Sequence, residues 1–296
     1  MKDGFVKVGA ATPSTRVADI AYNGEQIVKC CFDAAGNDCS LLVFPELCIT
    51  GYTCGDLFLQ ETFLESAYNE LYSIVESTSD LNMVIVVGLP LAFRDKLYNV
   101  AAVCYSGNVL GFVPKMNIPA YSEFYELRHF SPYDGLDCVY DEIPFGNILF
   151  RCASEPDFCF GVEICEDLWV PRAPSVELCI SGAKIICNLS ASDEVIGKGE
   201  YRRKLVSMQS ATLVCGYIYA DAGFGESTQD LIFAGHNLIC KNGNILSESK
   251  KYASDVIYSE IDLKRLAYER HRMNTFTTES GVEFEEVIFD QEPAYD

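Results

Sequence analysis

The chain has 296 residues, 49% of them apolar, and a formal charge of −21 at neutral pH. This composition is sufficient for a sizeable hydrophobic core, whereas a nucleic-acid or anionic-membrane surface would need clustered Lys and Arg to neutralise phosphates. We therefore expect a globular protein with no nucleic-acid partner and no membrane partner.

The N-terminus has no uninterrupted apolar stretch, and the longest apolar run, residues 83–93, is broken by Gly and Pro and too short to span a bilayer. The 14 cysteines lie in apolar runs without a C-x-x-C pair, and the three histidines are far apart in sequence. These features predict buried free thiols, no metal site and a cytoplasmic location.

Short β-rich runs alternate with helix-like segments through most of the chain. In the first third, we predict strands at residues 5–12, 40–46 and 82–90, and helices at 17–38 and 60–80. The strand at 40–46 has the apolar run LLVF before the proline and carboxylate that end it, which is typical of a buried strand.

Hairpins follow in the remainder of the chain. Residues 98–115 and 231–249 each show two strands around a turn that contains Gly and Asn. Between the hairpins we predict strands at 158–165, 183–192 and 216–223 and helices at 173–182 and 199–215. The mixture predicts an α/β (α+β) fold with layered sheets and external helices, formed by one domain at residues 1–275.

The C-terminal residues differ in composition from the rest of the chain. Residues 279–296 contain seven acidic residues and no basic residue. We interpret residues 276–296 as an acidic tail or as the start of a linker.

Three predicted strands end in residues that can carry chemistry, namely Glu46, Lys115 and Cys165. Each has an ordinary alternative when it is considered alone. Glu46 fits a helix N-terminal acid, Lys115 fits a solvated lysine after a hairpin, and Cys165 fits a core cysteine.

Cys165 lies between acidic neighbours, which disfavour the reactive thiolate form. A buried carboxylate at Glu46 can accept the thiol proton, and a lysine ammonium at Lys115 favours the thiolate and the later oxyanion of a tetrahedral intermediate. The three residues together indicate a cysteine nucleophile that is activated without a histidine.

The segments FPELCITGYT, PKMNIPAYSEFYE and GVEICEDLW resemble those that carry the Glu, Lys and Cys triad of the carbon-nitrogen hydrolase (nitrilase) superfamily. More narrowly, ELCITGYTCGDLF, EFYELRHF, CEDLWVP and NLSASDEVIGKGEYRR are similar to the glutaminase domain of glutamine-dependent NAD synthetases. The resemblance covers roughly residues 4–270 and implies the four-layer α-β-β-α sandwich of the nitrilase type.

The same resemblance implies roles for individual residues. Glu46 would be the general base, Lys115 the oxyanion-stabilising lysine and Cys165 the nucleophile. Glu123, eight positions beyond the lysine, would be a second glutamate near the triad, and the backbone N–H of Glu166 a second oxyanion donor. The implied reaction is hydrolysis of L-glutamine to glutamate and ammonia through a cysteine thioester.

By resemblance, the amino-acid end of glutamine would be held near Tyr52, Phe124, Glu166, Ser192 and Lys198. Relatives carry arginine at the position of Lys198, and a lysine offers a point charge in place of a bidentate fork. Aromatic packing is an equal alternative for Tyr52 and Phe124, and Ser192 also fits a cap at a strand-to-loop transition.

An NAD synthetase also needs an ATP-binding half with a Ser-Gly-Gly-x-Asp-Ser type loop, and this sequence contains no such run. We therefore expect no cofactor in this domain, with ATP and Mg²⁺ used only by a C-terminal synthetase domain that acts as its partner. The resemblance also implies a homo-oligomer. Two alternatives stay open, a free-standing amidase of the superfamily that acts on another small carboxamide and a non-catalytic interaction domain with this fold.

Overall fold

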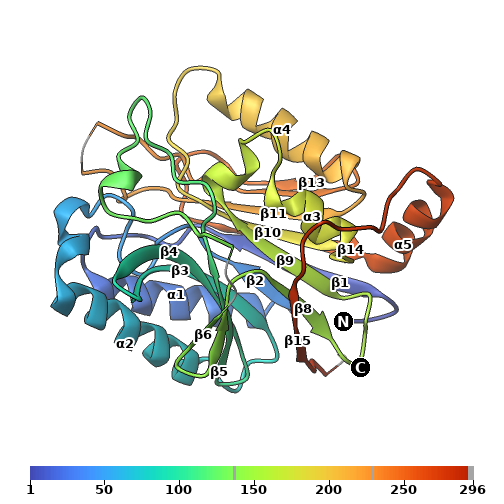
Figure 1. The fold of residues 1–296 in the computed structure, drawn as a ribbon, viewed down its shortest axis with the longest axis horizontal. Coiled ribbons are helices and arrows are strands. Elements are labelled where there is room, and N and C mark those ends of the chain that lie inside the picture. The colour runs from blue at the N-terminus through green and yellow to red at the C-terminus, as the bar shows by residue number, and fades with distance from the viewer. Residues whose placement is uncertain (136–137, 229, 293–296) are drawn as a thin grey trace.

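The computed structural model describes residues 1–135, 138–228 and 230–292. Two β-sheets lie face to face at its centre, and helices cover the outer face of each sheet (Figure 1). This is the four-layer α-β-β-α arrangement that the sequence motifs implied, and the α/β fold class is confirmed.

The first sheet has eight strands in the order β14-β1-β2-β3-β4-β5-β7-β6. The bounds are β1 Phe5–Ala11, β2 Leu41–Val43, β3 Val84–Phe93, β4 Lys96–Tyr105, β5 Asn108–Pro114, β6 Cys138–Tyr140, β7 Ile143–Phe145 and β14 Val256–Asp262. Helices α1 (Ile20–Ala35) and α2 (Glu61–Ser77) cover its outer face. Strands β1, β2 and β3 are parallel, and β5 runs in the same direction because β4 is antiparallel to both of its neighbours.

The second sheet has seven strands in the order β13-β12-β11-β10-β9-β8-β15. The bounds are β8 Ile148–Cys152, β9 Cys159–Ile164, β10 Ile185–Ser190, β11 Gly216–Asp221, β12 Leu238–Lys241, β13 Asn244–Glu248 and β15 Glu285–Phe289. Helices α3 (Pro174–Ile180) and α4 (Lys198–Thr212) lie on its outer face (Figure 1). Strands β9, β10 and β11 are parallel, so their carboxyl ends meet at one edge of the sheet.

The main core lies between the two sheets. Side chains such as Val8 and Val86 of the first sheet pack with Phe150, Phe160 and Ile218 of the second. A second apolar layer lies between the first sheet and its helices, and a third lies between the second sheet and its helices. The central strands are therefore buried on both faces, which explains why they appear in the sequence as nearly continuous apolar runs.

Most element predictions are confirmed, with shifts at the ends. The predicted strand at 40–46 is shorter, because β2 ends at Val43 and Pro45 has no N–H to donate to a neighbouring strand. The hairpin turn at Asn242 and Gly243 has positive φ at both residues, 44° and 84°, as a two-residue turn between strands requires.

The acidic C-terminal segment contains a strand, which corrects its interpretation as a tail. Strand β15 pairs in parallel with β8, and the Phe289 side chain is buried in the main core. Beyond the strand, Gln291 Nε2 donates hydrogen bonds to the carbonyl oxygens of Ser40 and Asn82, at 3.1 and 2.7 Å. Residues 285–292 are thus part of the fold, because alternate side chains on an acidic strand can still face the core.

The remaining elements are short or peripheral. Helix α5 comprises Leu263–Arg272, and 3₁₀ turns are found at η1 (Gly55–Leu59), η2 (Glu126–Arg128) and η3 (Cys165–Leu168). Within residues 1–135, 138–228 and 230–292, no helix has the length and apolar character needed to cross a membrane.

Candidate active site

The three predicted triad residues come at or shortly beyond the carboxyl ends of strands. Lys115 directly follows β5 and Cys165 directly follows β9, whereas Phe44 and Pro45 separate Glu46 from β2. Their exposed fractions are 0%, 1% and 6%, so all three lie below the protein surface. The structure therefore brings together two residues of the first sheet and one residue of the second.

Lys115 occupies the centre of this cluster. Its Nζ donates a hydrogen bond of 2.6 Å to Glu46 Oε1 and hydrogen bonds of 2.8 Å to both carboxylate oxygens of Glu126. Burial alone would lower the pKa of Lys115, but the Glu126 and Glu46 carboxylates raise it well above its usual range. Lys115 therefore stays a cation at neutral pH and is available to stabilise developing negative charge.

Glu46 is held in place by two further donors. Asn99 Nδ2 donates to Glu46 Oε1 at 2.6 Å, and the backbone N–H of Ala191 donates to Oε2 at 3.1 Å. The chain can make this turn because β3 has a glycine beneath it. A Cβ atom on Gly88 would lie 2.3 Å from the backbone nitrogen of Leu47 and 2.8 Å from the Pro45 carbonyl oxygen.

Cys165 is the first residue of the η3 turn and has a positive φ of 44°. Asp167, two residues later, fixes this turn by accepting hydrogen bonds from the backbone N–H of Ile164 and from the backbone and side chain of Asn117, at 3.0, 2.8 and 2.8 Å. Because Asn117 follows Lys115 by two residues, the Asp167 carboxylate joins the nucleophile turn to the lysine segment.

Burial and the neighbouring Glu46 carboxylate raise the pKa of the Cys165 thiol well above its usual value, against the opposing effects of Lys115 and the Ala191 N–H. The resting cysteine is consequently a neutral thiol. A thiol in this state becomes a nucleophile only when a base takes its proton, and Glu46 is a carboxylate close enough to act on the Cys165 pKa.

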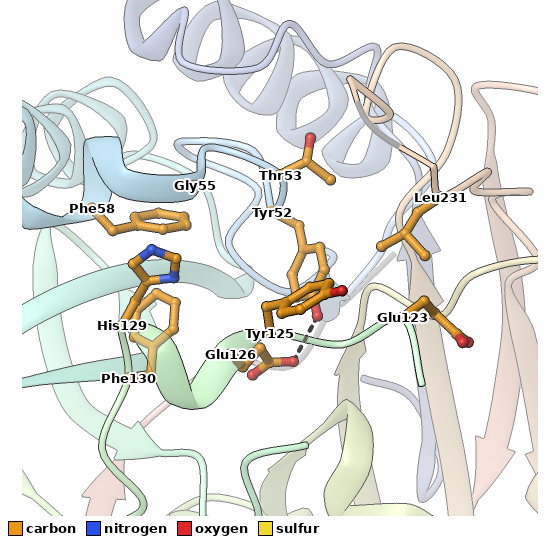
Figure 2. Close-up of a pocket in the computed structure, with 10 residues that line it drawn as sticks. All are labelled: Tyr52, Thr53, Gly55, Phe58, Glu123, Tyr125, Glu126, His129, Phe130 and Leu231. Atoms are coloured by element: carbon orange, nitrogen blue, oxygen red, sulfur yellow. Dashed lines mark hydrogen bonds between the residues drawn. The ribbon is translucent and has the colours of Figure 1, made fainter. Parts of the chain in front are cut away.

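The glutamate that contacts Lys115 is Glu126. This corrects the expectation that Glu123 would be the second glutamate beside the lysine. Figure 2 shows the Glu126 carboxylate directed at Tyr52, whose hydroxyl donates to Oε1 at 2.8 Å, whereas Glu123 points away from both. Burial raises the pKa of Glu126, against the effect of Lys115. The position in the sequence did not reveal this difference, because the residues between Lys115 and Glu126 form an irregular loop, and the burial of Glu126 is visible only in the structure.

Tyr52 is itself held by a second buried glutamate that the sequence analysis did not identify. Glu226 Oε1 accepts the backbone N–H groups of Tyr52 and Thr53, at 2.6 and 3.1 Å. Burial raises the pKa of Glu226 to about 8. Tyr52 lines a small cavity of about 60 Å³ that also contains Glu126 and His129 (Figure 2).

Cys165 opens onto a different and larger cavity of about 360 Å³. Four of the predicted substrate-binding residues line it, namely Phe124, Glu166, Ser192 and Lys198, and so does Glu123. Its remaining lining includes Pro119, Tyr121, Trp169, Val195, Ile196, Gly197 and Tyr201, which the sequence analysis did not single out. The expected substrate residues thus meet in one cavity, except Tyr52.

The wall of this cavity carries charge of both signs. Lys198 Nζ forms an ion pair with Asp193 and lies 5.4 and 5.5 Å from the ring centres of Phe124 and Trp169. On the acidic side, Glu166 accepts hydrogen bonds of 3.0 and 3.1 Å from the Tyr121 hydroxyl. Burial raises the pKa of the Glu166 carboxyl.

The three histidines lie in different surroundings. His129 contacts Asp56 and lines the small cavity, His236 lies between Arg202 and Glu248, and His271 is exposed on α5. In the part of the chain that the structure describes, no group of three or more His, Cys, Asp or Glu side chains has the arrangement of a metal site.

Several known proteins are similar to this chain in sequence and fold. Residues 7–269 match the family model of carbon-nitrogen hydrolases. The glutamine-dependent NAD(+) synthetase of Mycobacterium tuberculosis (strain ATCC 25618 / H37Rv) is 40% identical over 280 residues, which cover 92% of this chain and 41% of that protein. The chain therefore spans less than half the length of this curated relative.

Solved structures lead to the same family. A glutamine-dependent NAD(+) synthetase from Cytophaga hutchinsonii matches with a TM-score of 0.78 and 28% identity, over 87% of this chain and 43% of that one. An amidase of Nesterenkonia from the nitrilase superfamily shares the fold, with a TM-score of 0.69 and 18% identity over 90% of this chain and 96% of its own. The chain is an amide-hydrolysing enzyme and belongs to the carbon-nitrogen hydrolase family.

Proposed function

We propose that this chain is a glutaminase domain, which hydrolyses the side-chain amide of L-glutamine to glutamate and ammonia. In a longer protein, the ammonia would amidate nicotinic acid adenine dinucleotide in a C-terminal, ATP-dependent synthetase domain. The names of the M. tuberculosis and C. hutchinsonii relatives support this assignment. The observation that carries it is a cysteine, with its base and lysine, at a cavity whose wall bears both signs of charge.

The first chemical step follows from the arrangement around Cys165. As the sulfur attacks the amide carbon of glutamine, the thiol proton passes to the Glu46 carboxylate and a carbon–sulfur bond forms. Negative charge develops on the amide oxygen, where the Lys115 ammonium and the backbone N–H of Glu166 can stabilise it. Because burial and Glu46 raise the pKa of Cys165, the thiol has to give up its proton for the sulfur to attack, and Glu46 receives it in this proposal.

The second half of the reaction uses the same groups in reverse order. Protonated Glu46 transfers its proton to the amide nitrogen, the carbon–nitrogen bond breaks, and ammonia leaves a thioester on Cys165. Glu46 then removes a proton from water as the water attacks the thioester carbon. The carbon–sulfur bond breaks, the thiol recovers its proton, and glutamate is released.

The charged wall of the cavity suits an amino acid better than a neutral amide. Glutamine carries an ammonium and a carboxylate on its α-carbon, and the cavity lining includes Glu166 and also Lys198, the first residue of α4. A helix N-terminus adds favourable potential for a carboxylate. A small neutral carboxamide, the substrate of a free-standing amidase, carries no charge that could interact with either group.

We propose further that Glu123 contributes to the acidic side of the cavity and that Tyr52 acts by holding Glu126. Glu123 lines both the small cavity and the large cavity, and Tyr52 contacts Glu126 directly. These roles differ from contact with the reacting amide, which the geometry supports for Glu46, Lys115 and Cys165.

A cytoplasmic homo-oligomer is also part of this proposal. Exposed large apolar side chains line the cavities, including Tyr125 and Ile196, and such surfaces often mark contacts between proteins. The cysteines in the described parts of the chain are free thiols, as is usual in a reducing compartment. Light scattering coupled to size-exclusion chromatography tests the oligomeric state.

The test of the proposed function is substrate turnover. We expect the chain to release ammonia from L-glutamine, to do so much more slowly from small neutral amides, and to bind neither ATP nor the dinucleotide acid. Preference for a neutral amide would favour the free-standing amidase. Failure to turn over any amide, with Cys165 unreactive toward a diazo-ketone analogue of glutamine, would favour a non-catalytic domain.

A further inference from the structure

A fully buried arginine lies behind the substrate cavity. Arg202 comes from α4, has an exposed fraction of 0%, and is the largest side chain that the fold buries completely. A buried guanidinium is costly unless it is paired and hydrogen-bonded. Its contacts therefore indicate what it does.

One nitrogen of Arg202 holds the backbone loop that follows β10. Nη2 donates to the hydroxyl of Ser192 at 3.1 Å, to the Ser192 carbonyl oxygen at 3.4 Å and to the Asp193 carbonyl oxygen at 3.1 Å. The same loop is held from its other side, because Asp221 Oδ1 accepts the backbone N–H of Ser192 at 2.9 Å.

The other terminal nitrogen of Arg202, Nη1, connects this loop to the segment that precedes β12. Nη1 donates to Glu194 Oε2 at 3.1 Å and to His236 Nδ1 at 2.9 Å. Since the guanidinium has only donors, His236 Nδ1 must be the acceptor, and His236 Nε2–H then donates to Glu248 Oε1 at 2.7 Å. Arg202 therefore bridges the carboxyl end of β10 and the segment before β12.

The loop that Arg202 holds forms one wall of the cavity that contains Cys165. Ser192 lines the cavity directly, and Asp193 is the ion-pair partner of Lys198, which lines it as well. Arg202 is not among the lining residues. Its effect on a ligand must consequently pass through Ser192, Asp193 and Lys198.

We propose that Arg202 is a positioning residue that sets the affinity for the amino-acid end of the substrate. It does so by fixing Ser192 and, through Asp193, the ammonium of Lys198 at the cavity wall. This inference rests on the proposed function, because it assigns the wall to the α-carboxylate and α-ammonium of glutamine. The planar fork of arginine places one nitrogen on the Ser192 and Asp193 backbone and the other on the side chains of Glu194 and His236, and lysine has no second nitrogen for this geometry.

The proposal predicts a loss in binding that is separate from the chemical step. We expect Arg202→Met to raise KM for glutamine by about 10- to 100-fold, as loss of hydrogen bonds from a charged group implies. The rate at which iodoacetamide alkylates Cys165 should stay unchanged, because this small reagent needs no amino-acid site. Arg202→Lys should raise KM by a smaller factor, since it keeps the charge and loses the bridge.

Lys204→Met is the matched control. Lys204 lies on the same helix, points into solvent and pairs only with Glu200 among the ion pairs of the described residues, at 3.5 Å. Its substitution removes a cation from α4 and should leave KM unchanged. Thermal unfolding of each variant shows whether the fold survives, and Arg202→Lys decides the question if Arg202→Met does not fold.

The outcomes separate this proposal from the proposed function. If the unsubstituted chain neither hydrolyses glutamine nor reacts with its diazo-ketone analogue, the assignment of the cavity fails, and this inference fails with it. If the unsubstituted chain hydrolyses glutamine and folded Arg202 variants keep its KM, only the inference is overturned. An equal loss in glutamine turnover and in iodoacetamide alkylation would also overturn it, because that result indicates a general structural role.

Discussion

The Lys115 ammonium lies 2.6 Å from the carboxylate of Glu46, in a site that excludes solvent from both. One cation there serves two carboxylates, since Glu126 contacts the same nitrogen. In the proposed reaction, this arrangement places the base Glu46 and the charge-stabilising Lys115 side by side while the Cys165 thiol stays protonated.

The nucleophile can be tested by substitution and labelling. Cys165→Ala should abolish glutamine hydrolysis and covalent labelling by a diazo-ketone analogue of glutamine while the fold is retained, because only one thiol at a cavity is lost. Mass spectrometry of the labelled protein identifies the modified residue. Cys48, Cys54 and Cys187 are matched controls, as all three are buried thiols outside the large cavity. A label on one of these three would refute the assignment.

Activation without histidine makes a second prediction. Lys115→Met and Glu46→Gln should each lower kcat by roughly 10²- to 10⁴-fold, as expected for loss of an oxyanion donor or a proton carrier. Initial rates of ammonia release measure the effect. Substitutions of His129, His236 and His271 should have far smaller effects on kcat, and a histidine variant as inactive as Lys115→Met would indicate a Cys-His mechanism.

The two glutamates of the loop after Lys115 should differ in their effects. Glu126→Gln should lower kcat by about 10²-fold. Lys115 would then pair with Glu46 alone, and its ammonium would compete with the thiol proton of Cys165 for the Glu46 carboxylate. Glu123→Gln is the matched control and should leave kcat nearly unchanged, since it does not contact Lys115. Steady-state kinetics of both variants provide the comparison, and equal losses in kcat would contradict the placement of Glu126.

Glu226 predicts a dependence of stability on pH. Its pKa is raised from 4.5 to about 8 by burial. A carboxyl with a higher pKa in the folded state contributes stability that is complete below about pH 4.5 and is lost as the pH rises through about 8. Glu226→Gln removes this ionisation and keeps an oxygen that can accept the N–H groups of Tyr52 and Thr53.

The measurement is thermal unfolding of both proteins from about pH 5 to about pH 9. We expect Tm of the unsubstituted chain to fall more steeply with pH than Tm of Glu226→Gln. Parallel curves for the two proteins would show that Glu226 is already ionised in the fold at low pH. Other ionisable groups titrate in both proteins, so the difference between the curves isolates Glu226.

Asp167 should act on the orientation of the nucleophile. Asp167→Asn keeps one acceptor for Asn117 but turns an N–H group toward the N–H of Ile164, which destabilises the η3 turn. We expect a lower kcat with little change in KM and a changed pH profile of Cys165 alkylation. Glu163→Gln is a suitable control, because Glu163 accepts from Ser175 and Tyr217 on the side of α3 rather than from the lysine segment. If Glu163→Gln changed the alkylation profile in the same way, a specific role for Asp167 would be excluded.

Local patterns in the sequence determined much of this protein. Apolar runs predicted the buried strands, and the Asn242-Gly243 pair predicted a hairpin turn because few residues tolerate its positive φ. Strand ends pointed to Glu46, Lys115 and Cys165, and the motifs around them indicated the family. These features depend on residues close together in the chain, which is why they can be recognised without coordinates.

Only the tertiary structure decided which distant groups meet. The loop after Lys115 has no regular period, and resemblance to the family favoured Glu123, while the structure places Glu126 against Tyr52. The acidic segment at the C-terminus had the composition of a tail, yet Phe289 reaches the main core and makes it an edge strand. Arg202 stands beside a half-buried arginine, Arg203, in the sequence. The role of Arg202 depends on the ends of β10 and β11, because a charged side chain is buried only where the folded chain supplies its partners.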